Sequence, residues 1–152
     1  MQTTWLVAYD FSPLAHMALS TAARMLSAQG GGHLVVVHVH QLHTGIDGAG
    51  LDLATFGTSD LERAYVADAE QQLTSELATV TEPGVTIEQR IVQGRPATAL
   101  CKTAQDLGAA LIVIGSHGRT GLERLFIGSV AEAVLRHSPC PVLVIKQPAA
   151  KT

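Results

Sequence analysis

The sequence has 152 residues, a net charge of −3 and only three lysines, and its length fits one domain, residues 1–152, with a single core. The negative net charge and the scarcity of lysine disfavour a nucleic-acid partner, because phosphate backbones are bound by clustered Lys and Arg side chains. No apolar run approaches the roughly 18 residues of a membrane span. No basic segment precedes a long apolar one at the N-terminus, so we expect neither a membrane anchor nor a signal peptide.

The first predicted strand is the continuous apolar run Trp5–Tyr9. A helical pattern follows it from Ser12 and Pro13, since proline is tolerated in the first turn of a helix, and the glycines at 30–32 end that helix. The next continuous apolar run, Leu34–Val39, predicts a second strand that is covered on both faces.

The middle of the chain contains a long connection, a helix and an alternating strand. Residues 40–58 are rich in glycine and lack apolar periodicity, so we expect this connection to be either mobile or functional. A second helix is predicted by apolar residues at every fourth position: Leu61, Tyr65, Ala69, Leu73 and Leu77. Val85–Val92 alternates between apolar and polar residues, which predicts a strand at the edge of a sheet.

The C-terminal part of the chain repeats the alternation of helix and strand. A third helix is predicted from Pro96 to Gly108 and a fourth over Ser129–His137. Continuous apolar runs at Leu111–Ile114 and Val142–Ile145 predict the last two strands. Strands that alternate with helices predict right-handed βαβ units, and so an α/β fold with a doubly wound, five-stranded parallel sheet and helices on both faces.

The strongest chemical signal follows the fourth predicted strand. Gly115 and Gly118 end that strand in a tight turn, and Gly128 opens the last helix at Ser129. Glycine lets a backbone approach a ligand closely, and the N–H groups at a helix start point outward without intrahelical acceptors. A strand, a loop and a helix start of this kind predict a phosphate-binding site.

The carboxyl ends of the other predicted strands lie at the same edge of the parallel sheet. Ligands of open parallel sheets bind beyond these ends. Asp10 is expected to accept hydrogen bonds from ribose hydroxyls, and backbone groups near Val39 to read the polar edge of an adenine. Ser129 and Val130 are expected to donate to phosphate oxygens. The predicted nucleotide site consists of Asp10, Val39, Gly115, Ser116, His117, Gly118, Gly128, Ser129 and Val130.

These motifs resemble the universal stress protein family. The resemblance is carried by Gly115-x2-Gly118-x9-Gly128-Ser129, by Val7–Ser12 and by Ser129–Ile145, and it extends over essentially the whole chain. It implies the strand order 3-2-1-4-5 and a homodimer. Because every glycine of the motif is present, it also implies membership of the ATP-binding branch. The family often has Thr or Ser after the valine, where this chain has Ala131, so one phosphate contact of the family is in question here.

Other chemistries fit the sequence less well. The loop is not a Walker A motif, because no Lys follows its second glycine. Arg119 and Arg124 either neutralise phosphate or are ordinary surface cations. A zinc site built on His38, His40 and His43 is disfavoured, since no cysteine lies close in sequence, and we expect no resident metal.

Catalysis also has little support. Phosphoryl transfer needs carboxylates that hold a metal, a cation and a positioned base. Asp10 is the one carboxylate expected at the switch point of the sheet, and Glu123 in the loop is a second candidate. We therefore expect an ATP-binding stress-response or regulatory protein without catalytic residues, with Mg²⁺ as an optional companion of ATP. A slow ATP hydrolase or self-phosphorylating enzyme, and a dimeric interaction module with an unused site, are the two alternatives.

The last strand and the composition bear on assembly and location. Val142, Leu143, Val144 and Ile145 would form an exposed edge in the order 3-2-1-4-5, so we expect a homodimer in which this strand pairs with its copy. Charged residues make up 15% of the chain, against about 25% in an average domain, which also favours a buried interface. The two cysteines are scattered in apolar patterns, which predicts buried thiols and a cytoplasmic protein.

Overall fold

The computed structural model describes residues 2–41, 58–118 and 126–148, and the sequence predictions for Arg119, Glu123, Arg124 and the connection after Gln41 lie outside them. Strands and helices alternate along the chain. Their bounds are β1 (Thr4–Ala8), α1 (Pro13–Ala28), β2 (Gly32–His40), α2 (Thr58–Leu77), β3 (Val85–Gln93), α3 (Pro96–Leu107), β4 (Leu111–Gly115), α4 (Ser129–His137) and β5 (Val142–Ile145). Each element lies within a few residues of its predicted position.

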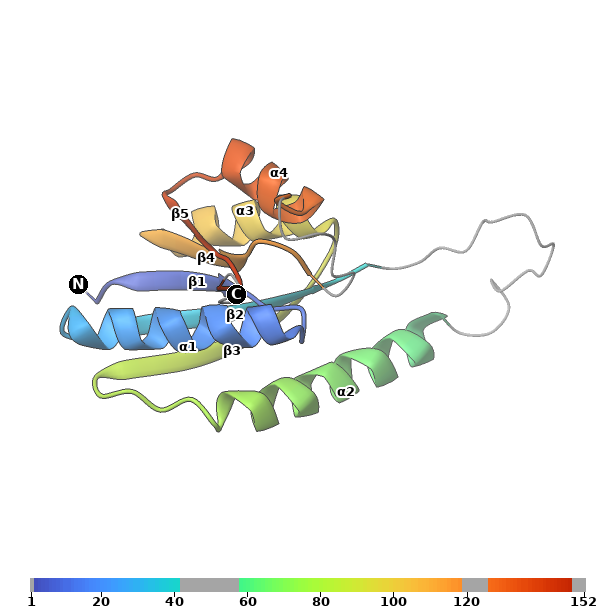
Figure 1. Ribbon diagram of the computed structural model, residues 1–152. Helices are drawn as coiled ribbons and strands as arrows, with labels where there is room; N and C mark the ends of the chain where they lie inside the picture. The colour runs from blue at the N-terminus through green and yellow to red at the C-terminus, as the bar shows by residue number, and fades with distance from the viewer. Residues whose placement is uncertain (1, 42–57, 119–125, 149–152) are drawn as a thin grey trace.

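The five strands form one parallel sheet in the order β3-β2-β1-β4-β5, as predicted. Helices α1 and α2 lie on one face of the sheet and α3 and α4 on the other (Figure 1). The order reverses between β1 and β4, and this is the position at which open parallel sheets leave a crevice beyond their carboxyl ends. None of the described helices is long and apolar enough to cross a membrane.

Alternation along the strands divides the core into two clusters, one on each face of the sheet. Trp5 and Val7 of β1 pack toward α1 and α2, together with Leu73 of α2. The intervening residues Leu6 and Ala8 pack toward α3 and α4. Because both faces are covered, the central strands read as continuous apolar runs in the sequence.

Local signals in the sequence account for the helix ends. Ser12 caps α1, with its hydroxyl oxygen accepting a hydrogen bond from the Ala15 N–H at 3.1 Å, and Pro13 occupies the first turn. Gly108 ends α3 in the left-handed conformation, with a φ of 58°.

Helix α2 is longer than the sheet that it covers. Its predicted apolar stripe is buried only at Ala69 and Leu73, whereas Leu61 is 69% exposed and Tyr65 is 47% exposed. The N-terminal half of α2 extends past the ends of the strands (Figure 1), so the first two residues of the stripe have little sheet to pack against.

The amino end of the sheet is closed by glycines. The Gly32 N–H donates to the Gly84 carbonyl at 2.9 Å, which joins the α1–β2 turn to the turn before β3. Gly31 lies directly on Gly84: a Cβ at Gly31, which has a φ of +91°, would be 2.2 Å from the Gly84 carbonyl oxygen. Only glycine fits there, because both the space and the backbone conformation exclude a side chain.

The cysteines differ from the sequence prediction. Cys101 and Cys140 are free thiols that pack against the cluster under α3 and α4, but both are only partly buried. Partial burial still raises the pKa of Cys101, with a smaller contribution from Cys140.

Candidate functional site

A cavity of about 320 Å³ opens at the carboxyl ends of β1, β2 and β4, between the start of α1 and helices α3 and α4. This volume is at the lower end of the range of small-molecule sites, roughly 300–1,000 Å³. Eight of the nine predicted site residues line the cavity, all except Ser116. The residues that the sequence singled out therefore lie around one space.

One wall of the cavity is apolar. It is formed by residues at the strand ends and in the first turns of α3: Ala8, Val37, Val39, Ile114, Pro96 and Leu100. Only Val39 was predicted individually. The others were missed, although Val37 shares the face of Val39 by alternation and Pro96 begins the helix after β3.

Asp10 provides the carboxylate of the site. Its Oδ1 accepts a hydrogen bond from the Ser12 N–H at 3.0 Å, which fixes the side chain within the β1–α1 turn. A Cβ placed on Gly118 would be 2.5 Å from Asp10 Oδ2, so this oxygen lies against the backbone of the glycine loop. Glycine at 118 leaves room for the carboxylate at the cavity.

The start of α4 forms the opposite side of the cavity. Gly128 is the N-cap and has no side chain to cap the helix, so the first N–H groups of α4 have neither an intrahelical acceptor nor a side-chain one from the cap. Ser129, Val130 and Ala131, which carry these groups, all line the cavity. The positive end of the α4 dipole therefore faces the cavity, an arrangement that favours an anion.

The buried residue Ser116 supports the turn between Gly115 and Gly118 by its hydrogen bonds. It is 1% exposed, and its hydroxyl is hydrogen-bonded to His117 Nδ1 at 2.9 Å. Its carbonyl accepts from the Gly128 N–H at 2.6 Å, and its own N–H donates to the Ile145 carbonyl at 2.8 Å. Ser116 thus holds the start of α4 and the end of β5 in place, while His117 lines the cavity.

Tyr9 joins the cavity to the opposite face of the sheet. The residue lines the cavity, while its hydroxyl donates a hydrogen bond to the Glu76 carboxylate of α2. Burial, followed by this hydrogen bond, raises the pKa of Tyr9 well above its usual value. Tyr9 therefore remains protonated and keeps its hydrogen bond to α2 throughout the physiological range.

His38 of β2 takes a structural position. His38 is buried, with Nδ1 2.9 Å from the Tyr9 carbonyl oxygen and Nε2 3.1 Å from the Tyr65 hydroxyl. The described residues contain no group of three or more His, Cys, Asp or Glu side chains arranged to hold a metal ion. His43, the third member of the disfavoured zinc site, lies outside them.

Comparison with known proteins identifies relatives of the whole chain. The sequence matches the model of the universal stress protein family over residues 1–146. Universal stress protein MJ0531 of Methanocaldococcus jannaschii is 48% identical over 67 residues, and this match covers 44% of the chain but only 39% of that protein. Universal stress protein MJ0577 of the same organism is 29% identical over 151 residues, 91% of each protein.

Solved structures give the same result for the fold. The structure of MJ0577 superimposes with a TM-score of 0.78 and 26% identity over 99% of both chains. The universal stress protein from Archaeoglobus fulgidus in complex with dAMP superimposes with a TM-score of 0.62, covering 96% of this chain and 98% of that one. At 23% identity this second likeness establishes a shared fold and nothing finer.

Proposed function

The chain belongs to the universal stress protein family, and from this premise we propose that its cavity binds an adenine nucleotide, specifically ATP. The observation that supports this best is the placement of the Asp10 carboxylate and the start of α4 on two sides of one apolar cavity. A nucleotide has three parts that match these surfaces: a flat apolar base, a sugar with hydroxyls, and an anionic phosphate chain.

The base is assigned to the apolar wall. Val37, Val39 and Leu100 present aliphatic surface. The β1–β2 ladder ends at Ala8 and Val37, so on the β1 side the backbone of Val39 lies beyond it and is available to the polar edge of adenine. The family member in complex with dAMP is a precedent for an adenine nucleotide on this fold.

The sugar and phosphates are assigned to the two polar sides. Asp10 accepts hydrogen bonds from the ribose hydroxyls, since Oδ2 lies at the cavity beside Gly118. The N–H groups of Ser129 and Val130, with the Ser129 hydroxyl, bind the phosphates at the positive end of α4. Ala131 has no hydroxyl to add to this set, which leaves the phosphate contacts to the backbone and Ser129.

A regulatory role fits these residues better than rapid catalysis. Among the described residues that line the cavity, Asp10 is the only carboxylate, and none is Lys or Arg. Rapid phosphoryl transfer needs more charged groups than that. Mg²⁺ would be bound by the phosphates of ATP themselves, whose oxygens suit this ion. Slow hydrolysis or self-phosphorylation is the alternative function, and a turnover far below the ~1 s⁻¹ of ordinary enzymes is the most that we expect.

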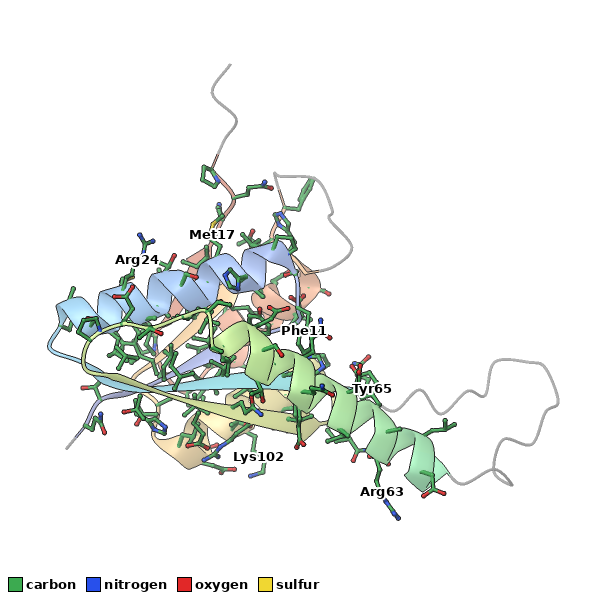
Figure 2. The ribbon with its side chains drawn as sticks, turned by 90° about the horizontal axis from the view of Figure 1, so that it is seen from below. Phe11, Met17, Arg24, Arg63, Tyr65 and Lys102 are labelled. Carbon is green, nitrogen blue, oxygen red and sulfur yellow. The ribbon has the colours of Figure 1, made fainter. Side chains whose placement is uncertain are left out.

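Calorimetry on tag-free protein tests the site. ATP is expected to bind more tightly than GTP, and Asp10→Ala to weaken ATP by roughly 0.5–1.5 kcal/mol, or up to about 3 kcal/mol for a charged acceptor. Arg24→Ala, an exposed change on α1 (Figure 2), is the matched control and should leave the affinity unchanged. An Asp10→Ala variant that melts at a lower temperature but binds ATP as tightly as wild type would limit Asp10 to the turn.

We propose further that this cytoplasmic, one-domain protein is a homodimer formed through β5. β5 lies at the edge of the sheet next to β4, with its two faces packed against the two core clusters. An apolar edge of this kind is an aggregation hazard unless it is paired or covered. Sedimentation at micromolar concentration should give about twice the chain mass, and Val144→Pro should release monomers by removing a backbone donor. A wild-type monomer in that experiment would refute the dimer.

A further inference from the structure

Phe11, between β1 and α1, has an unusual backbone. Its φ is 63°, and among the described residues it is the only one other than glycine with a positive φ. A bulky side chain in this region is an outlier that persists only where surrounding contacts maintain it. Phe11 directly follows Asp10, so its conformation sets the course of the chain next to the carboxylate of the site.

Two aromatic contacts hold the Phe11 ring. Tyr9 meets it edge-on, with ring centroids 5.4 Å apart and planes at 82°, and His38 lies 4.7 Å away at 60°. Both partners are themselves fixed, His38 between the Tyr9 carbonyl and the Tyr65 hydroxyl, and Tyr9 by its hydrogen bond to Glu76. Figure 2 shows Phe11 between α1 and α2, the helices that cover this face.

The ring of Phe11 lies outside the cavity. It packs against the core cluster under α1 and α2, whereas the apolar wall of the cavity is formed by the other face of the sheet and by α3, and Phe11 is not among the lining residues. Phe11 therefore acts on a ligand only through its neighbours. The nearest one is Asp10, whose Oδ1 is bonded to the Ser12 N–H on the far side of Phe11 and whose Oδ2 adjoins Gly118.

We infer that Phe11 is a positioning residue for Asp10: its ring, held by Tyr9 and His38, keeps the turn in the left-handed conformation that aims the carboxylate at the ribose hydroxyls. The inference rests on the proposed function, because it requires Asp10 to contact the sugar. Without the ring contacts the turn would relax, and Asp10 would lose its place beside Gly118 while the base and phosphate surfaces remained intact.

The test compares ATP with 2′,3′-dideoxy-ATP, which lacks the hydroxyls assigned to Asp10. A net hydrogen-bond contribution of about 1 kcal/mol makes wild type bind ATP about fivefold more tightly than the dideoxy compound. Phe11→Gly accepts a positive φ but has no ring, so it should fold and bind both nucleotides about equally. Phe11→Leu, which keeps apolar volume without a flat ring, is the second variant and should also reduce the ratio.

Two variants serve as controls for this ratio. Phe11→Tyr keeps the ring and should keep the wild-type ratio. Val85→Ala removes another partly buried side chain from the same core cluster, at the amino end of the sheet, whereas the turn lies at the carboxyl end. This control should lower stability without altering the ratio of the two affinities. If the role of Phe11 were purely structural, Phe11→Gly would behave in the same way. A fivefold ratio that survives in Phe11→Gly would overturn the inference.

A double variant tests whether Phe11 acts through Asp10. If it does, adding Phe11→Gly to Asp10→Ala should change ATP affinity no further, a departure from additivity expected of residues that share one contact. Additive losses would overturn the inference. A wild-type protein that binds both nucleotides equally would overturn it as well, while leaving adenine-nucleotide binding intact. A protein that binds neither would refute the proposed function itself.

Discussion

At the amino end of the sheet, Gly31 has a φ of +91° and lies against the backbone of Gly84, whereas Gly118 and Gly128 at the carboxyl end avoid the left-handed φ range altogether. A Cβ at Gly31 would meet a carbonyl oxygen at 2.2 Å, and one at Gly118 would meet the end of the Asp10 side chain at 2.5 Å. Backbone cannot yield to such a contact, but a carboxylate can turn away. Gly31 is thus required by the fold, and Gly118 by the position of the Asp10 carboxylate.

The largest expected effect is on the free energy of unfolding of Gly31→Ala. The positive φ alone costs about 1–3 kcal/mol, and the clash with Gly84 adds to it. Gly30→Ala is the matched control, because Gly30 has a φ of +100° but nothing within 4 Å of an added Cβ. Urea denaturation should show Gly31→Ala to be the less stable of the two. Equal stability would mean that the two turns separate easily.

Gly128→Val comes next and is expected to act on ligand affinity. A Cβ at this position would be 3.2 Å from the Ser116 carbonyl oxygen and 3.3 Å from His117 Cα, so a branched side chain must push the loop away from the start of α4. ATP affinity measured by calorimetry should fall by at least about tenfold, or 1.4 kcal/mol. Unchanged affinity would remove the start of α4 from the site.

Gly118→Ala should have a smaller effect that separates affinity from stability. The added methyl displaces the Asp10 carboxylate, so ATP affinity should fall by roughly 0.5–1.5 kcal/mol while the unfolding free energy changes little. Gly108→Ala is the reverse case, since Gly108 has a φ of 58° and open space around it. It should lose about 1 kcal/mol of stability and no affinity. A Gly118→Ala variant with normal ATP affinity would contradict the role given to this glycine.

The smallest expected effect is the most specific. In an Asp10→Ala background the methyl of Gly118→Ala meets no carboxylate, so it should change ATP affinity by close to zero. The double variant, measured by the same calorimetry, is expected to match Asp10→Ala alone. A further loss would show that the backbone at Gly118 itself contacts the nucleotide.

The sequence predicted the fold closely because its signals are local or strongly patterned. Ser129–His137 was predicted to the residue, and Val85–Val92 was placed at an edge from its alternation alone. The order of the strands came from the family resemblance and not from periodicity. Leu61 and Tyr65 could not be predicted as exposed, since their spacing matches that of Ala69 and Leu73 and only the length of the sheet separates them.

The candidate site was predicted where backbone and motif determine it. Gly118 and Ser129, which line the cavity, were predicted because the glycine spacing and the start of a helical pattern are both visible in the sequence. Ser116 was assigned to the ligand by its place in the motif, but the turn directs it inward. The positive φ of Phe11 has no sequence signature, since nothing about a phenylalanine indicates that neighbouring rings will hold it in that conformation.

Ser116 joins the start of α4 to the edge strand β5. Its N–H donates to the Ile145 carbonyl of β5, and its carbonyl accepts from the Gly128 N–H at the start of α4. A shift of either β5 or α4 would therefore strain a hydrogen bond to the same buried residue. If this connection couples pairing along β5 to nucleotide binding, thermodynamic linkage makes the coupling reciprocal. If pairing along β5 tightens nucleotide binding by some factor, nucleotide must tighten pairing by the same factor. The fraction of paired chains at a given protein concentration would then report the nucleotide concentration around it.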